Sequence, residues 1–361
     1  MVAPEQREKF ERDGYLVVEN AGFPDALLDG IVADLDGLYR GEERIEDGVF
    51  YASHRIGEAW KISDNVRSLA LDPAVHAIVE ELYGRRPMPF QTLNFRTGTE
   101  QAVHSDTIHF NSMPPGFMCG AWVALEDIDM DNGPVVYYPG SHTLPEVTLQ
   151  DVGPDADEAA YTRYLDEMVD RLGLEPAYAT IGRREVLLWA SNLLHGGSPQ
   201  RDKSRTRHSQ VTHFFFEGCK YWQPLLSTPE EIHWRHPIWI SDATSPEASI
   251  RVREAIERAV PSGSTVLVAS RGDEEVVRIA GSRGWHFPQD EHGVWPGYYP
   301  TDSDDAVAQL EALRERGADH LVLPESARWW LDHYEGFARH LEERYEKLRD
   351  EPGECVIFAL R

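Results

Sequence analysis

Between about residues 90 and 216 the chain becomes a series of short β-rich runs separated by turn-forming residues, and this pattern constrains the fold most strongly. The clearest runs are Phe117–Leu125, Pro134–Tyr138, Glu185–Trp189 and Ser209–Phe216. Many short strands divided by Gly, Pro, Asn and Asp are typical of a β-sandwich or barrel. The sequence therefore predicts a β-rich core over about residues 88–216.

Helical patterns precede this core. Apolar residues recur at intervals of three and four over Pro24–Leu38 and Pro73–Tyr83, which predicts two amphipathic helices. Pro4–Asp13 also has a helical pattern with a proline in its first turn, and Tyr15–Val18 reads as a strand. We expect these N-terminal helices to pack on one face of the β-rich core.

The sequence pattern changes after residues 223–247, a segment rich in Pro, Ser, Thr and Trp. Strands and helices then alternate, an order typical of a small, mostly parallel α/β sheet. The expected elements are a helix near Ile250–Val260, a strand at Thr265–Ala269, a helix at Asp304–Arg316, a strand at His320–Pro324, a helix around Tyr334–Arg349 and a strand at Cys355–Leu360. This segment has no glycine-rich phosphate-binding loop, so a nucleotide site there is unsupported.

These patterns predict an α+β protein with two domains. The first covers residues 1–235, a linker covers 236–247, and the smaller α/β domain covers 248–361. A chain of 361 residues is long enough for two cores.

Composition limits the classes of binding partner and the cellular compartment that we expect for this protein. The formal net charge of −27, from 62 acidic and 35 basic residues, argues against a nucleic-acid or anionic-membrane partner. Three separated cysteines, Cys119, Cys219 and Cys355, form no disulfide framework or zinc pattern. No signal-peptide core is present, and no stretch approaches the roughly 18 apolar residues of a membrane span. We expect a cytoplasmic protein with a small-molecule substrate; the sequence does not determine its oligomeric state.

A set of metal-ligand candidates lies in the β-rich region. His104-Ser105-Asp106, the only His-x-Asp of the chain, follows the strand-like run Phe90–Gly98. An imidazole and a carboxylate on one ion are two thirds of the facial triad that binds non-haem Fe(II). His195 comes 89 residues after Asp106 and precedes two glycines, which let the backbone bend and approach a metal. Together these residues predict a site for an oxygen-activating metal.

A cation suited to an acidic co-substrate follows. Arg207 lies twelve residues after His195 at the head of the run Ser209–Phe216. A guanidinium grips a carboxylate through two parallel hydrogen bonds. Arg201, Lys203 and Arg205 are nearby, and such a basic cluster alone is typical of a solvated loop.

Residues 1 to about 235 resemble the phytanoyl-CoA dioxygenase family of Fe(II)/2-oxoglutarate oxygenases. Members of this family fold as a double-stranded β-helix, also called a jelly roll and similar to the cupins. The motifs that carry the resemblance are His104-Ser-Asp106, Gly120–Asp127, Asn132–His142, His195-Gly-Gly with Arg207, and the opening Phe10–Val18.

The resemblance implies a set of site residues. His104, Asp106 and His195 would bind iron, and Arg207 would hold the distal carboxylate of 2-oxoglutarate. Arg205 remains the alternative anchor, because both arginines lie near the family's spacing. The other residues implied to contact the co-substrate are Lys61, Trp122 and Asn94.

The resemblance also implies the reaction. Related halogenases have a small residue in place of the acidic ligand, whereas this chain has Asp106, so we expect hydroxylation of an aliphatic C–H bond with O2 consumed and succinate and CO2 released. His109, His142 and His213 are expected to be structural or to support the metal ligands, rather than to act as catalysts. Two alternatives stay open: a cupin-like metalloprotein that does not use 2-oxoglutarate, and a catalytically silent binding protein.

The C-terminal segment has a looser resemblance of its own. Ala318–Tyr334 with Phe337–Leu341 resembles a small α/β domain of bacterial glycosyltransferases and surface-polysaccharide proteins. This implies a sugar-bearing substrate or a secondary metabolite for the enzyme. Trp329-Trp330 is either a sugar-stacking platform or part of the core.

Overall fold

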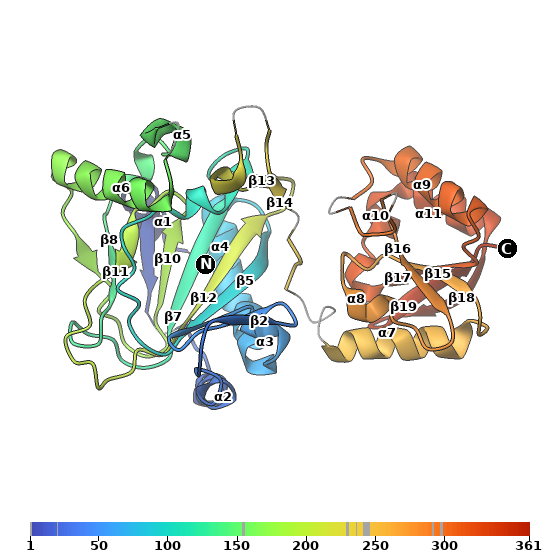
Figure 1. Cartoon of the computed structure of the whole chain (residues 1–361), viewed down its shortest axis with the longest axis horizontal. Helices are drawn as coiled ribbons and strands as arrows, with labels where there is room; N and C mark the ends of the chain where they lie inside the picture. Colours follow the sequence, from blue (N-terminus) through green and yellow to red (C-terminus); the bar gives the residue numbers. More distant parts are fainter. Residues whose placement is uncertain are drawn as a thin grey trace. The chain divides into compact units, whose positions relative to one another are not determined.

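A computed structural model describes residues 2–19, 21–153, 156–228, 231–235, 237–240, 246–290, 292–296 and 299–361. The chain divides into two compact units, Met1–Arg235 and His236–Arg361, and each is described by itself (Figure 1). Half of the predicted linker, 236–247, lies outside the described residues. Within the described ranges, no helix has the length and apolar character needed to cross a bilayer.

The N-terminal helices lie close to where the sequence predicts them. Helix α1 spans Pro4–Asp13, with proline at its start and Gly14 in the left-handed region (φ 78°) at its end. Helix α4 spans Pro73–Tyr83, and the Asp72 carboxylate accepts the free N–H groups of its first turn. The remaining helices before the core are α2 (Asp25–Asp36) and α3 (Asp64–Ala70). Helices α3 and α4 both contact strand β5 of the sheet that follows.

An eight-stranded antiparallel sheet forms the body of the first unit, in the order β1-β10-β7-β12-β5-β4-β3-β2 (Figure 1). Its strands are β1 (Tyr15–Val18), β2 (Arg44–Glu46), β3 (Val49–Tyr51), β4 (Arg55–Gly57), β5 (Pro87–Phe95), β7 (Met118–Ala124), β10 (Val186–Ala190) and β12 (Ser209–Phe216). Every residue of the central strands β7 and β12 is buried, which explains the continuous apolar run of β7 and the three phenylalanines that end β12.

A three-stranded antiparallel sheet, β11-β8-β9, lies against the large one. Its strands are β8 (Val135–Tyr137), β9 (Ala177–Tyr178) and β11 (His195–Gly197). Buried side chains of both sheets, including Trp122, Leu187 and Tyr137, form one core cluster. Two antiparallel sheets with flanking helices confirm the predicted β-rich class. A third small sheet joins β6 (Asn111–Met113), β13 (Lys220–Trp222) and β14 (Trp234–Arg235).

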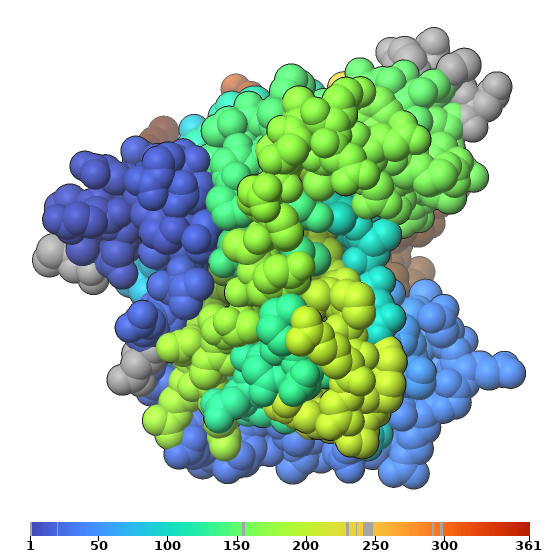
Figure 2. Space-filling model, turned by 90° about the vertical axis from the view of Figure 1, so that its left-hand side faces the viewer, coloured from blue at the N-terminus to red at the C-terminus, as the bar shows by residue number. Residues whose placement is uncertain are grey.

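The sequence analysis did not predict α3 or two later helices of this unit, α5 (Leu149–Val152) and α6 (Glu158–Leu172). Helix α6 buries Tyr161, Leu165 and Met168 against Ile108 and Leu194. Figure 2 shows this helix, in green, across the top of one face of the unit. Because Ile108 and Leu194 are close in sequence to Asp106 and His195, α6 supports both candidate metal-ligand segments from outside.

The second unit contains one five-stranded sheet in the order β16-β15-β17-β19-β18. The strands are β15 (Thr265–Val268), β16 (Arg283–His286), β17 (His320–Pro324), β18 (Glu346–Glu351) and β19 (Cys355–Ala359). The helices are α7 (Pro246–Ala259), α8 (Glu274–Val277), α9 (Ser303–Glu315), α10 (Trp330–His333) and α11 (Glu335–Arg344).

Two predictions for this unit need correction. Only β16, β15 and β17 run parallel; β19 is antiparallel to β17 and to β18, so the sheet is mixed rather than mostly parallel. The helix expected to continue to Arg349 ends at Arg344, and strand β18 follows it. Both differences have one cause: β18 and β19 form a hairpin through a tight turn at Gly353, and only antiparallel strands can be joined so closely.

Candidate metal centre

A cavity of about 320 Å³ opens at one face of the large sheet. Its walls include Gln91 and Leu93 of β5, Trp122 of β7, and Val211 and His213 of β12. Two loops of this unit come from distant parts of the sequence and contact each other. The Asp202 N–H donates to the Asp131 carbonyl over 2.8 Å. Figure 2 shows these loops, near residues 130 and 200, side by side on one face.

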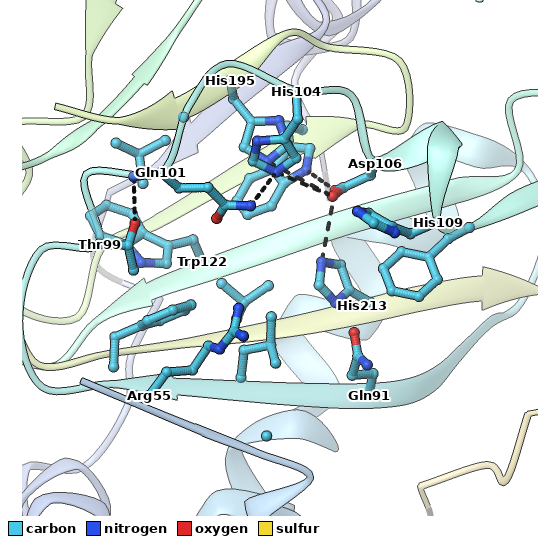
Figure 3. A pocket seen from close by; sticks show the side chains of 18 of the residues that line it. Arg55, Gln91, Thr99, Gln101, His104, Asp106, His109, Trp122, His195 and His213 are labelled. Atoms are coloured by element: carbon cyan, nitrogen blue, oxygen red, sulfur yellow. Dashed lines mark hydrogen bonds and ion pairs between the residues drawn. The ribbon is translucent and has the colours of Figure 1, made fainter. Parts of the chain in front are cut away.

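His104, Asp106 and His195 come together at the wall of this cavity (Figure 3). His104 and His195 face each other through a pair of backbone hydrogen bonds of 2.9 and 3.0 Å. Asp106 begins the short 3-10 turn η2 (Asp106–Ile108), which brings its carboxylate back toward the two rings. Its Oδ1 lies 3.9 Å from each Nε2, and one ligand atom from each residue lies within 4.8 Å of the others.

Hydrogen bonds to the backbone fix the orientation of both imidazoles. Nδ1 of His104 lies 3.0 Å from the Ala102 carbonyl, and Nδ1 of His195 lies 2.9 Å from the Leu193 carbonyl. A carbonyl only accepts, so we assign the proton to Nδ1 in both rings. Each Nε2 then keeps its lone pair for a metal ion, as metal-binding histidines require.

The charge states of the donors also suit a cation. Burial, and then the neighbouring His195, lowers the pKa of His104 to about 3, so this imidazole is neutral. Burial alone would raise the pKa of Asp106, but the surrounding histidines and the Trp189 indole hold it below its ordinary value. Two imidazoles and one carboxylate are the donor set of the 2-His-1-carboxylate triad, so these residues fit a non-haem Fe(II) ion.

Arg207 lies in the same cavity and has no carboxylate partner among the described residues. Its side chain is 3% exposed, Nε has no hydrogen-bond acceptor, and Nη2 donates to the Thr97 carbonyl over 3.3 Å. The rings of Phe95 and Trp122 each lie 5.4 Å from its guanidinium carbon. Burial lowers the pKa of Arg207 to about 10, which is still a cation at neutral pH.

The alternative anchor, Arg205, has a different environment. It is at the surface, where Nη1 donates to both oxygens of Asp129 over 2.8 and 2.9 Å. It is not among the residues that line the cavity. Arg205 is therefore already paired, whereas Arg207 is buried and open to an anion.

The three other residues implied to bind the co-substrate differ in position. Trp122 lines the cavity. Asn94 does not, because side chains alternate along β5: Gln91, Leu93 and Phe95 face the cavity, and Asn94 points to the opposite face, where Nδ2 donates to Gln210 over 3.1 Å. Lys61 also lies outside the lining, in the turn η1 (Ala59–Lys61), and Nζ donates to the Gly48 carbonyl over 3.0 Å.

Sequence reasoning missed Arg55, which lines the cavity from β4 (Figure 3). Its Nε has no hydrogen-bond partner, and burial lowers the pKa of Arg55. Glu58 lines the cavity beside it, and burial raises the pKa of its carboxyl. No motif marks these residues, and β4 has only three residues, too few to stand out in the sequence.

The three histidines expected to be structural occupy different surroundings. His213 and His109 line the cavity, and Nε2 of His213 lies 3.7 Å from Asp106 Oδ2. His142 is elsewhere, with Nε2 3.1 Å from the Glu11 carbonyl.

Comparison with known proteins places this site in a family. The family profile described as phytanoyl-CoA dioxygenase (PhyH) matches residues 10–209, more than half of the chain. The chain belongs to the phytanoyl-CoA dioxygenase family. The match spans all three members of the candidate triad and Arg207, and it ends before the second unit.

Relatives within and near this family share moderate identity with the chain. The phytanoyl-CoA dioxygenase domain-containing protein 1 of Mus musculus is 25% identical over 289 residues, which cover 63% of this chain and 96% of the relative. The ectoine dioxygenase of Stutzerimonas stutzeri (strain A1501) is 28% identical over 235 residues, covering 55% and 72%. The crystal structure of EctD from S. alaskensis with 2-oxoglutarate and 5-hydroxyectoine has a TM-score of 0.50 at 20% identity, covering 62% and 79%. The last likeness shows the shared fold.

Proposed function

We propose that the chain is an Fe(II)- and 2-oxoglutarate-dependent dioxygenase that hydroxylates an aliphatic C–H bond of a small molecule. One observation carries the proposal: a single cavity contains a three-residue metal-ligand set and, separately, the buried cation of Arg207. A metal site alone has no need of a desolvated guanidinium. A co-substrate that carries two carboxylates, one for the metal and one for the arginine, uses both features. Membership of the family supports the same cofactors.

Each residue has a defined task in this proposal. His104, Asp106 and His195 hold the ion from one side, which leaves positions open toward the cavity. Arg207 pairs with the distal carboxylate of 2-oxoglutarate, and the rings of Phe95 and Trp122 keep water from that ion pair. Trp189 donates to Asp106 and so fixes which carboxylate oxygen faces the ion.

Bound Fe(II), with 2-oxoglutarate and O2, supplies the oxidant that inserts one oxygen atom into a C–H bond while succinate and CO2 leave. The presence of Asp106 favours hydroxylation over halogenation, because the carboxylate fills the position that a halide needs. The chain's own contribution is to hold the reactants close together in a cavity that its aromatic side chains shield from solvent.

The substrate side of the cavity is polar. Arg55, Glu58, Gln91, His109 and His213 line it, and Phe110 and Leu93 add apolar contacts. A volume of about 320 Å³, shared with the co-substrate, suits a small molecule with polar groups at its ends. The partly buried Arg55 provides a second position for an acidic group, which would come from the substrate when Arg207 holds the co-substrate.

The proposal is tested by adding Fe(II) and 2-oxoglutarate anaerobically to the purified protein. We expect a visible metal-to-ligand charge-transfer band that needs both additions, and succinate release on exposure to O2 with a suitable substrate. Arg207→Gln should raise the 2-oxoglutarate concentration at which the band is half formed by roughly ten- to 100-fold, since a hydrogen-bonded charge contributes about 1.5–3 kcal/mol. The matched variant Arg205→Gln should leave it unchanged. A protein that binds Fe(II) but shows no such band would overturn the proposal.

A further inference from the structure

The second unit has a topological switch point in its sheet. Strand β15 lies between β16 and β17, and all three run parallel (Figure 1). The chain leaves β15 toward β16 on one side and then returns to form β17 on the other. In open α/β sheets, ligands bind in the crevice outside the carboxyl ends of strands at such a point. The corresponding position here is between the loop after β15 and the loop after β17.

Arg271 connects those two loops. It follows β15, and its Nη1 donates to the carbonyl of Ser326, in the loop after β17, over 3.3 Å. The side chain is only 5% exposed, yet Nε and Nη2 have no hydrogen-bond partner, and the described residues offer it no carboxylate. A buried guanidinium with two unused donors is costly unless an acceptor completes it.

The loop that carries Arg271 is held in an unusual conformation. Arg271 has a φ of 56°, in the left-handed region that few residues other than glycine adopt. Ser270 fixes the loop: its Oγ lies 2.5 Å from Nδ1 of His286 at the end of β16, and it accepts the Gly272 N–H over 3.3 Å. Nε2 of His286 in turn lies 3.3 Å from Glu274. Such strain, kept in place by neighbouring hydrogen bonds, is found mainly at functional sites.

Aromatic rings lie beside the same loop. The ring of Trp295 packs so closely on Gly272 that a Cβ there would lie 2.8 Å from it. Tyr299 contacts Trp295, with ring centroids 6.5 Å apart, and Trp329, at 5.4 Å. Trp329 is 38% exposed, whereas Trp330 is completely buried in the core. The ring of Trp295 thus offers a flat apolar surface beside the loop that carries Arg271.

We propose that the region between the loops after β15 and β17 is a second ligand site, in which Arg271 binds the oxyanion of a small molecule, a phosphate or a carboxylate group. The glycine-rich loop that cradles phosphates in nucleotide-binding folds is missing from this segment, and a side chain supplies the donors instead. The site belongs to the second unit and is independent of the oxygenase cavity.

The full-length protein can be tested with the simplest carriers of each group, inorganic phosphate and acetate. Hydrogen exchange followed by mass spectrometry should show slower exchange in peptides containing residues 270–273 and 326–328 when one of the anions is added. Protection by phosphate alone assigns a phosphoryl ligand, and protection by acetate alone a carboxylate. Protection by both assigns a general oxyanion site. No protection by either anion at millimolar concentrations would overturn the proposal.

Variants separate Arg271 from the other arginines. Ligand-observed NMR should show phosphate or acetate binding about tenfold weaker in Arg271→Gln, the loss expected for a charge-assisted hydrogen bond. Arg278→Gln, at an exposed arginine paired with Glu275, should bind like the wild type. Arg207→Gln removes any contribution of anion binding in the oxygenase cavity to the NMR signal. If Arg271→Gln does not fold, Arg271→Lys, which keeps the charge but not the fork of donors, replaces it; unchanged binding in the folded variant contradicts the assignment.

Discussion

The indole Nε1 of Trp189 donates to Oδ2 of Asp106 over 2.7 Å, inside the protein. This hydrogen bond occupies one carboxylate oxygen and leaves Oδ1 facing both imidazoles. The Trp189 ring also lies against His195, with centroids 4.9 Å apart. One side chain thus orients two of the three proposed ligands.

Trp189→Phe should therefore weaken metal binding without unfolding the protein. Phenylalanine keeps most of the ring contacts but cannot donate, and loss of a partner that orients a ligand typically costs about 10–100-fold in metal affinity. Titration with Fe(II) or Co(II) measures the change. Trp122→Phe is the matched control, because the Trp122 Nε1 has no hydrogen-bond partner. An equal loss of affinity in both variants would show that the hydrogen bond is unimportant.

Gly120 leaves space for the Trp189 ring. Gly120→Ala should therefore displace this ring and so disturb the candidate metal site. The two residues are paired across β7 and β10, and a Cβ on Gly120 would lie 2.6 Å from the indole nitrogen. We expect a loss of roughly 1–3 kcal/mol in the free energy of unfolding, as for other overpacked cores, together with weaker metal binding. Urea unfolding and metal titration measure the two effects.

Gly153→Ala is the control for this substitution. Gly153 has extended backbone (φ 162°), and no atom lies within 4 Å of an added Cβ. It should change the stability by less than about 0.5 kcal/mol, as is usual for surface sites. Gly120→Ala with wild-type stability and metal affinity would mean that Trp189 can move without consequence.

The candidate triad could be predicted from sequence because its ligands lie in two short segments with distinctive neighbours. His104 and Asp106 are one residue apart, and His195 precedes two glycines. The structure explains the glycines: a Cβ on Gly196 would lie 2.7 Å from the Gln101 carbonyl, in the loop that leads to His104. Close approach of two backbones thus brings the two histidine segments together.

The residues implied only by the resemblance to the family do not all line the cavity. Asn94 could have been excluded by alternation along β5, since Phe95 and Leu93 already face the cavity. Arg55 could not have been found, because β4 has three residues and its position beside β5 depends on tertiary pairing. The same limit explains β18: its charged residues fit a helical pattern, but pairing with β19 makes it an edge strand, where charges are common.

Arg207→Met should stabilise the protein in the absence of ligands. The guanidinium is buried without a carboxylate partner, and its lowered pKa reflects the unfavourable desolvation. Replacing it with a flexible apolar side chain removes that cost, so we expect a gain of roughly 0.5–2 kcal/mol, the usual range for such substitutions. Arg183→Met, at a partly exposed arginine 2.6 Å from Asp29, should give no gain. Urea unfolding compares them, and destabilisation by Arg207→Met would contradict the interpretation that this cation is kept for a ligand.

His76 should make the first unit less stable in mild acid. Burial lowers its pKa below the ordinary value of 6.5, although the Ala70 carbonyl, 3.0 Å from Nε2, and the nearby Asp72 and Glu80 oppose the shift. Below about pH 6.5 the unfolded chain therefore binds a proton that the folded protein does not, and the free energy of unfolding falls as the pH falls. His76→Gln can keep the hydrogen bond but cannot titrate, so between pH 7.5 and 5.5 its stability should fall less steeply than that of the wild type. One proton limits the difference in slope to about 1.4 kcal/mol per pH unit. Urea unfolding at several pH values measures both slopes, and identical slopes would show that His76 titrates equally in the folded and unfolded states.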